Sequence, residues 1–116
     1  MRPLVLASTS PARRALLERV GLRFEVAPPG VEERLAPTGD PVDQARRLAF
    51  EKARAVAGRR PEATVIGADQ VLVLDGRALG KPADEAEARA LLRAMAGRTH
   101  ALVTGVAVVD ADAIWQ

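Results

Sequence analysis

The sequence has no cysteine and a single histidine, His100, among its 116 residues. Without cysteine there is no disulfide, no zinc–thiolate site and no thiol nucleophile. One histidine excludes the metal motifs that need two. Any chemistry carried by this sequence must therefore use carboxylates, hydroxyls and cationic side chains.

Aromatic residues are scarce too, with two phenylalanines, one tryptophan and no tyrosine. The net charge is only +2, and no basic cluster is interleaved with aromatics, so we expect no nucleic acid polymer as partner. We expect no leader peptide, because no charged-then-apolar segment opens the chain. No apolar run approaches the roughly 20 residues of a membrane span. The sequence therefore predicts a soluble, cytoplasmic protein without a membrane partner.

Lysine is rare in a chain that is otherwise rich in positive charge. Lys52 and Lys81 are the only lysines among seventeen basic residues, and the rest are arginines. Arginine is a planar fork of donors, whereas lysine is a compact charge on a flexible stem. A retained lysine indicates a site that needs a point charge, for example against a phosphate. Asp69 lies between the two lysines in sequence, an order that suits an anionic, metal-bound substrate.

Strand and helix signals alternate along the chain. Apolar and β-branched runs predict strands over residues 3–7, 22–26, 64–74 and 99–109, with a last one beginning near Ile114. Caps, prolines and closing glycines predict helices over residues 11–20, 41–57 and 85–96. Asp75 and Gly76 form a hairpin signal after the third strand. The alternation predicts one α/β domain over residues 1–116, with a mixed sheet flanked by helices.

The last residues indicate a hairpin that is only half made. The segment Asp110-Ala111-Asp112 predicts a turn, and Ala113-Ile114-Trp115 the start of a returning strand with an exposed tryptophan. A frayed natural terminus is one explanation. We expect instead that the domain is incomplete at the C-terminus, because a lone strand edge is poorly protected.

Lys52 falls inside the apolar stripe of the second predicted helix. That stripe has helical spacing and consists of Ala45, Leu48, Ala49, Ala53 and Val56. A lysine in a core-facing stripe must snorkel to solvent, pair with a carboxylate or face a polar cleft. The spacing alone leaves these three alternatives open.

The first predicted helix begins with a polar corner. Arg13 lies on the apolar face made by Leu16, Leu17 and Val20, and its side chain leans toward the helix N-terminus. Ser8 and Ser10 add hydroxyls where free N–H groups and the positive dipole end of the helix attract anions. These features favour a phosphate-binding corner over an ordinary capped helix. Arg14 lies on another side and is placed to pair with Glu18 at i,i+4.

Two carboxylates are candidates for chemistry. Asp69 interrupts the most apolar predicted strand, where a carboxylate is costly unless it is paired or bound to a metal. A structural ion pair with an arginine is one explanation, and a catalytic base or magnesium ligand is the sharper one. Glu33, in the predicted loop, offers a second carboxylate, although loop acids are usually only solvated.

Five segments, in this order, resemble the Maf family of nucleoside triphosphate pyrophosphatases, also described as septum-formation inhibitor proteins. They span nearly the whole chain and are highly specific when taken together. The segments are Leu6-Ala7-Ser8-Thr9-Ser10-Pro11-Ala12-Arg13-Arg14-Ala15-Leu16-Leu17, Arg47-Leu48-Ala49 with Glu51-Lys52-Ala53, Ile66-Gly67-Ala68-Asp69-Gln70-Val71, Leu79-Gly80-Lys81-Pro82, and Gly97-Arg98-Thr99-His100 leading to Thr104-Gly105-Val106.

The resemblance implies a Maf/ITPase-like fold and hydrolysis of a nucleotide between its α and β phosphates. It implies a divalent metal, magnesium or manganese, a nucleoside triphosphate as substrate and a homodimer. It makes Asp69 the proton acceptor and, with Glu33, a metal ligand. The substrate-binding residues that it implies are Ser8, Ser10, Arg13, Arg14, Glu33, Lys52 and Lys81.

The resemblance also bears on the base. Gln70 after the aspartate looks like the branch acting on 7-methyl-GTP, whereas the dTTP/UTP branch usually has threonine there. Ala12 occupies a second discriminating position and is smaller than the residue expected in either branch. We therefore expect 7-methyl-GTP, with dTTP/UTP hydrolysis or a non-catalytic, nucleotide-binding role in cell division as alternatives.

Overall fold

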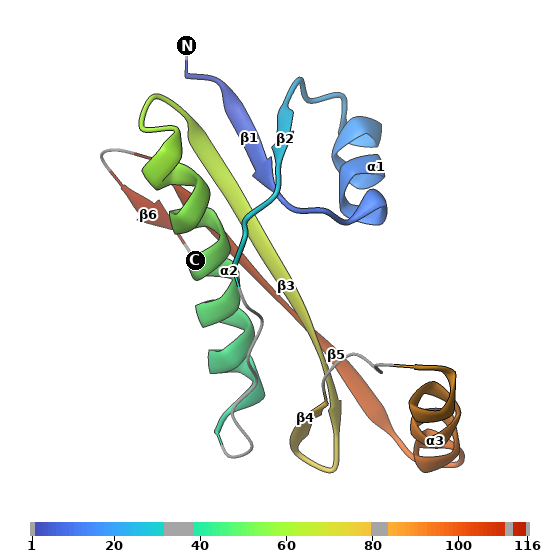
Figure 1. Ribbon diagram of the computed structural model, residues 1–116. Coiled ribbons are helices and arrows are strands. Elements are labelled where there is room, and N and C mark those ends of the chain that lie inside the picture. Colours follow the sequence, from blue (N-terminus) through green and yellow to red (C-terminus); the bar gives the residue numbers. More distant parts are fainter. Residues whose placement is uncertain (1, 32–38, 80–83, 111–112, 116) are drawn as a thin grey trace.

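The computed structural model describes residues 2–31, 39–79, 84–110 and 113–115, and strands and helices alternate along them (Figure 1). The bounds of these elements are β1 Leu4–Ala7, α1 Pro11–Val20, β2 Glu25–Ala27, α2 Pro41–Arg59, β3 Thr64–Leu74, β4 Arg77–Leu79, α3 Glu85–Met95, β5 His100–Val109 and β6 Ile114–Trp115. Among the described residues, none of the helices is long and apolar enough to cross a membrane.

The strands form one mixed sheet. Its order is β2-β1-β3-β5-β6, and β4 pairs with β3 beside this path. β1 runs parallel to both β2 and β3, whereas β3 runs antiparallel to β4 and β5. The α/β fold with a mixed sheet and helices, predicted from the alternation of elements, is confirmed.

Most element boundaries follow from local chemistry. Ser10 caps α1 by accepting from the Arg13 backbone N–H, and Gly21 ends the helix in the left-handed region at φ 86°. Asp75 (φ 53°) and Gly76 (φ 75°) both have positive φ, as the predicted two-residue hairpin turn requires.

Two predicted boundaries are wrong. The second strand is shorter than the predicted 22–26 and lies at Glu25–Ala27, because only these residues pair with β1. α2 continues through Gly58 to Arg59 instead of ending near Ala57. A glycine lowers helix propensity by only about 1 kcal/mol, which the packing of a long helix readily offsets.

The core lies between α2 and one face of the sheet. The predicted stripe of α2 is buried throughout, with Leu48 1% exposed and the three alanines and Val56 at 0%. These side chains face Val5, Ala7, Val65 and Ala107 of the three central strands, and most of them belong to one hydrophobic cluster. The amphipathic pattern of this helix therefore predicts its buried face correctly.

The other two helices do not bury a face. In α1, Leu16 is 61% and Val20 is 67% exposed, whereas Arg13 and Leu17 on the same side are partly buried. In α3, Leu92 is 67% exposed. α3 lies at the end of the β3–β5 pair farthest from β1, and the molecule is elongated, measuring 49 × 28 × 22 Å (Figure 1). Periodicity marks an apolar side of a helix, but not whether another element covers it.

Among the described residues, the sheet face opposite α2 is exposed along β5. Leu102 and Val106 of β5 alternate with the residues that face α2, and both are exposed. Leu6 of β1 points to this second face as well, yet it is only 2% exposed. The second face is therefore covered near β1 and open along β5.

Candidate functional site

The candidate site lies where β1 ends and β3 continues. Ala7 is the last residue of β1 and pairs with Gly67, so Ala68 and Asp69 of β3 extend past it. β1 lies between its parallel neighbours β2 and β3. The chain crosses from β1 to β2 through α1, and back from β2 to β3 through α2. Because both crossovers are right-handed and run in opposite directions, the two helices lie on opposite faces of the sheet. Such a point, outside the carboxyl end of a strand where the chain order reverses, is where open α/β sheets bind ligands.

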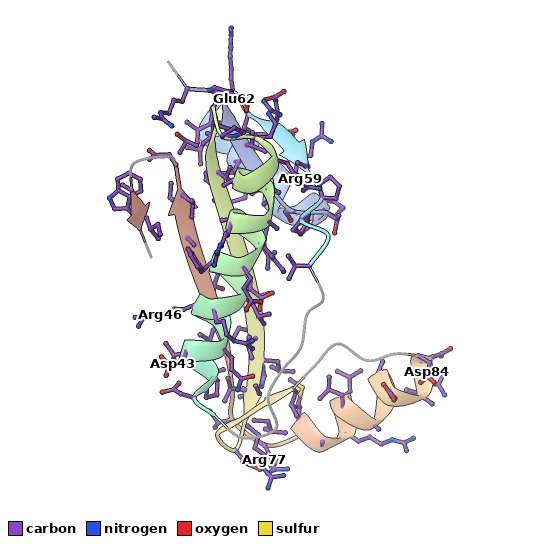
Figure 2. All side chains as sticks on the ribbon, turned by 60° about the vertical axis from the view of Figure 1, so that its left-hand side comes forward. Asp43, Arg46, Arg59, Glu62, Arg77 and Asp84 are labelled. Carbon is purple, nitrogen blue, oxygen red and sulfur yellow. The ribbon has the colours of Figure 1, made fainter. Side chains whose placement is uncertain are left out.

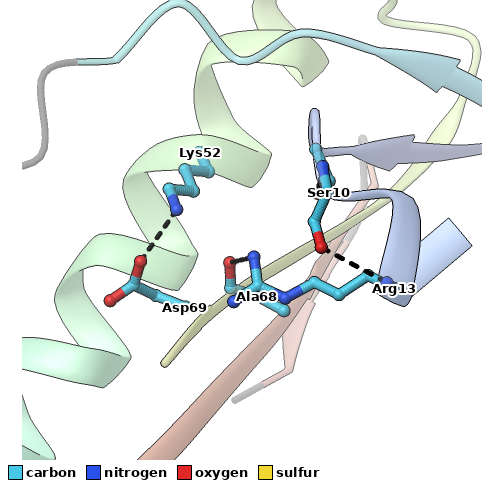
Figure 3. A network of polar contacts seen from close by, with 6 residues as sticks. Ser10, Arg13, Lys52, Ala68 and Asp69 are labelled. Carbon is cyan, nitrogen blue, oxygen red and sulfur yellow. Dashed lines mark hydrogen bonds and ion pairs between the residues drawn. The ribbon is translucent and has the colours of Figure 1, made fainter. Parts of the chain in front are cut away.

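Lys52 of α2 and Asp69 of β3 form a buried ion pair at this point. Lys52 Nζ lies 2.8 Å from Asp69 Oδ1, and each residue is only 4% exposed (Figure 3). The structure thus decides between the alternatives left by the sequence: Lys52 does not snorkel, and the cation on Asp69 is this lysine. Removing two charges from water costs several kcal/mol per ion, so the pair persists only because its geometry is close.

Two glycines, Gly67 and Gly105, face α2 beside Asp69 and were not among the predicted site residues. A Cβ at Gly67 would lie 2.2 Å from Ala49 O, and one at Gly105 would lie 2.4 Å from Ala45 O. Both positions interrupt β-branched strands, and a glycine inside a strand often marks the close approach of another backbone. That signal was present in the sequence and could have identified them.

Arg13, Ser8 and Ser10 gather on the other side of the β3 backbone. Arg13 Nη1 donates to Ala68 O at 2.9 Å, one residue before Asp69 (Figure 3). Ser8 is 4% exposed, and its Oγ accepts from the Ser10 backbone N–H at 2.9 Å. The predicted corner of two hydroxyls and an arginine at the start of α1 therefore adjoins the Lys52–Asp69 pair.

Three other predicted residues have no hydrogen bond to this group among those that the described residues show. Arg14 is exposed, and its Nε donates to Glu18 Oε1 at 3.1 Å, which confirms the predicted i,i+4 pair. Ala12 lies in the exposed first turn of α1. Gln70 follows Asp69 and therefore points to the opposite face of the sheet, where its Nε2 lies 3.4 Å from Thr104 Oγ1.

The remaining two predicted residues, Glu33 and Lys81, lie outside the described residues. Within residues 2–31, 39–79, 84–110 and 113–115, no three His, Cys, Asp or Glu side chains gather closely enough to hold a metal ion. Asp69 is the carboxylate that the described part of the chain brings to the site.

Comparison with known proteins finds relatives that are about 50% identical to this chain, and three different enzyme names occur among them. The chain is 50% identical over 112 residues to the dTTP/UTP pyrophosphatase of Symbiobacterium thermophilum, covering 97% of this chain and 58% of the relative. It is 55% identical over 111 residues to the 7-methyl-GTP pyrophosphatase of a Polaromonas species, covering 96% and 51%. It is 52% identical over 111 residues to the nucleoside triphosphate pyrophosphatase of Nitrobacter winogradskyi, covering 92% and 55%.

The chain thus spans about half the length of the curated relatives that it matches. Residues 3–116 match the family described as Maf-like protein, a range that includes all the residues gathered at the carboxyl end of β1. On this match across almost its whole length, the chain belongs to the Maf family.

Proposed function

We propose that this chain forms the catalytic half of a nucleoside triphosphate pyrophosphatase, which cleaves between the α and β phosphates to give a nucleoside monophosphate and pyrophosphate. The observation that carries the proposal is the buried Lys52–Asp69 contact at the carboxyl end of β1. Such a buried pair contributes little net stability, so folding alone gives little reason to place it at this point of the sheet. The names of the relatives support the same reaction.

The two partners of the ion pair have separate roles in this reaction. Lys52 exchanges Asp69 for phosphate oxygens when the triphosphate binds, and Arg13 adds a second cation from the start of α1. The released Asp69 carboxylate then accepts the proton of the attacking water. Cations fixed beside the phosphates stabilise the charge that builds up in the transition state.

A divalent metal fits this arrangement only together with the substrate. Magnesium is usually held by one or two carboxylates plus substrate phosphates, and the described residues supply one carboxylate, Asp69. We propose that Asp69, together with oxygens of the triphosphate, would hold a magnesium or manganese ion, which would neutralise phosphate charge. Glu33, the second predicted ligand, lies outside the described residues.

The nucleobase is proposed from resemblance, with 7-methyl-GTP ranked first and dTTP and UTP second. Gln70 supports this order, because threonine is usual at that position in the dTTP/UTP branch. Since its side chain lies on the sheet face opposite Asp69, its influence on the base would act through β3 and β5 and not through contact with the pair. Relatives carry both substrate names.

The decisive experiment measures pyrophosphate release from a panel of 7-methyl-GTP, dTTP, UTP and GTP, with magnesium and with a chelator. With the chain extended to the length of its relatives, we expect turnover of 7-methyl-GTP with metal and its loss in Asp69→Asn, whereas the 116 residues alone should show low activity or none. Asp43→Asn is the matched control, because Asp43 is an exposed carboxylate in the first turn of α2 (Figure 2) and the substitution removes the same charge.

Three results would count against these proposals. Turnover of dTTP or UTP in preference to 7-methyl-GTP overturns the ranking of bases. Turnover by Asp69→Asn equal to that of Asp43→Asn overturns the role of Asp69. Tight binding of a non-hydrolysable triphosphate without turnover of any nucleotide would favour a nucleotide-binding regulator instead.

A further inference from the structure

α2 rests on the sheet through backbone atoms at two points. At Gly67, a Cβ would meet Ala49 O at 2.2 Å and Ala53 N at 2.8 Å. At Gly105, a Cβ would meet Ala45 O at 2.4 Å and Arg46 N at 2.9 Å. Real Cβ atoms essentially never approach closer than 3.0 Å, so any side chain at either position would push the helix away.

Both contacts flank the carboxylate of Asp69. Gly67 precedes Asp69 by two residues on β3, and Gly105 lies directly opposite Asp69 on β5. Because side chains alternate along a strand, Asp69 and Gly67 point to the same face of the sheet, and so does Gly105 across the ladder. The two glycines therefore set the height of α2 above the sheet on two sides of the Lys52–Asp69 pair.

The ion pair is sensitive to that height. The Nζ–Oδ1 distance is 2.8 Å, while a Cβ at Gly105 lies about 1 Å short of ordinary contact, which begins at 3.4 Å. With the Lys52 side-chain conformation unchanged, a retreat of α2 by that amount lengthens the Nζ–Oδ1 distance beyond about 3.2 Å, where such hydrogen bonds end. Ala45, Ala49 and Arg46 cannot relieve the clash by changing rotamer, since the atoms in the way belong to their backbones.

We propose that Gly67 and Gly105 are positioning residues, whose missing side chains seat α2 low enough for Lys52 to reach and bury its contact with Asp69. The structural part of this inference concerns the protein without ligand. Its catalytic consequence rests on the function proposed above, in which Lys52 and Asp69 take part.

The scarcity of lysine provides a direct measurement of this contact. Lys52 and Lys81 are the only lysines, so acylation of each by acetic anhydride can be followed separately by mass spectrometry. Wild-type Lys52 should react slowly, because it is 4% exposed and bound to Asp69. In Gly105→Ala and in Gly67→Ala, its labelling rate relative to Lys81 should rise by about tenfold or more, as expected when a charge-assisted hydrogen bond is lost.

The chain offers a matched control for the substitution itself. Gly58 also lies in α2, and a Cβ there would have nothing within 4 Å. Gly58→Ala should leave the labelling of Lys52 unchanged, while Asp69→Asn gives the rate for a lysine whose partner has been removed directly.

A second control separates positioning from loss of stability. Leu48→Ala weakens the packing of the same helix without adding an atom beneath it. When the two variants are compared under conditions that give them the same free energy of unfolding, Lys52 should be acylated more slowly in Leu48→Ala than in Gly105→Ala. Where a glycine variant is poorly folded, labelling is carried out in sucrose, which favours the compact state. Labelling of Lys52 in folded Gly105→Ala and Gly67→Ala that stays at the wild-type rate, or only equals that of Leu48→Ala, overturns the proposal.

The catalytic consequence is tested separately. If the pyrophosphatase proposal holds, Gly105→Ala lowers kcat while Gly58→Ala does not. If no nucleotide is turned over, the labelling result still decides whether the glycines position Lys52. Faster labelling with unchanged kcat would confine the glycines to a role in the resting protein and would overturn their role in catalysis.

Discussion

α2 and α3 are both amphipathic in sequence, yet only one of them joins the core. α2 buries seven residues against β1, β3 and β5, whereas α3 buries none and lies at the far end of the β3–β5 ladder (Figure 1). Both begin with an aspartate cap that accepts a backbone N–H. The two helices therefore start in the same way locally and differ in what lies beneath them.

The difference lies in the strands that receive the helix. α2 presents three alanines at i, i+4 and i+8, and the sheet below it carries Gly67 and Gly105. Small residues on both surfaces bring the backbones close together, and within that close contact an ion pair is held away from water. Helical periodicity alone does not distinguish this helix from α3, but glycines within the receiving strands do.

The largest effect on stability is expected from removing the buried positive charge of α2, which is Lys52. Lys52→Met leaves Asp69 buried without this cation and should destabilise the protein by about 3–5 kcal/mol. Arg54→Met on the exposed side of the same helix should change stability by less than about 0.5 kcal/mol. Urea unfolding followed by circular dichroism measures both.

A double variant that removes both charges tests whether the loss of stability in Lys52→Met is electrostatic. Lys52→Met combined with Asp69→Leu removes both charges and should be markedly more stable than Lys52→Met alone, since apolar replacement of a buried pair is often neutral. A double variant no more stable than the single one would contradict an electrostatic cause.

A smaller effect is expected from leucines at equivalent places in the two helices. Leu48→Ala in α2 should cost about 2–4 kcal/mol, because Leu48 is 1% exposed and truncation leaves a cavity. Leu92→Ala in α3 should cost less than about 0.5 kcal/mol, because Leu92 is 67% exposed. Equal losses in urea unfolding would mean that α3 is covered in solution.

The helix caps offer a finer comparison. Asp40→Ala should lower the global free energy of unfolding by about 1 kcal/mol, because α2 unfolds together with the core. Asp84→Ala removes a similar contact from α3, which has no buried residue to hold it, so its loss should appear as local fraying. Amide hydrogen exchange distinguishes the two outcomes, and slow exchange throughout α3 in Asp84→Ala would contradict the second.

The smallest effect is expected at the surface beyond the end of α2. A hydrogen bond from Arg60 at 2.8 Å lowers the pKa of Glu62 from its ordinary 4.5. A lowered folded pKa means that the stability from this contact is present above about pH 4.5 and is lost as the pH falls through the folded value. Arg60→Gln should raise the pKa of Glu62 in an NMR titration.

Arg59→Gln is the matched control for this titration. It removes the same charge one residue earlier, but Arg59 Nη2 donates to Pro28 O and not to Glu62. An equal rise of the Glu62 pKa in both variants would indicate long-range charge and not the hydrogen bond as the cause.

Much of this arrangement was predictable from the sequence because its causes are local. Ser10-Pro11, Asp75-Gly76 and the apolar run over residues 64–74 predict a cap, a turn and β3, and the structure has all three. Lys52 in an apolar stripe and Asp69 in an apolar strand each indicated an unusual charge. Their contact spans seventeen positions, so it depends on the packing of α2 on the sheet.

What the sequence left undetermined depends on tertiary packing. Leu16 and Val20 form an apolar side of α1 by spacing, yet no described element buries them, and spacing carries no information about that. Gln70 follows Asp69 in one motif, and the resemblance treats the two as neighbours in a site. The pleat of β3 sends them to opposite faces, as strand geometry would have predicted.

Because Asp69 and Gln70 lie on opposite faces of β3, these two adjacent positions have different neighbours. Position 69 is constrained by a buried charge beneath α2, whereas position 70 lies on an open surface where it meets Thr104 of β5. Residue 70 can therefore vary without disturbing the ion pair, and a library that randomises both positions should show nearly additive effects. The two residues of this motif are thus held by separate contacts, Asp69 by Lys52 and Gln70 by Thr104.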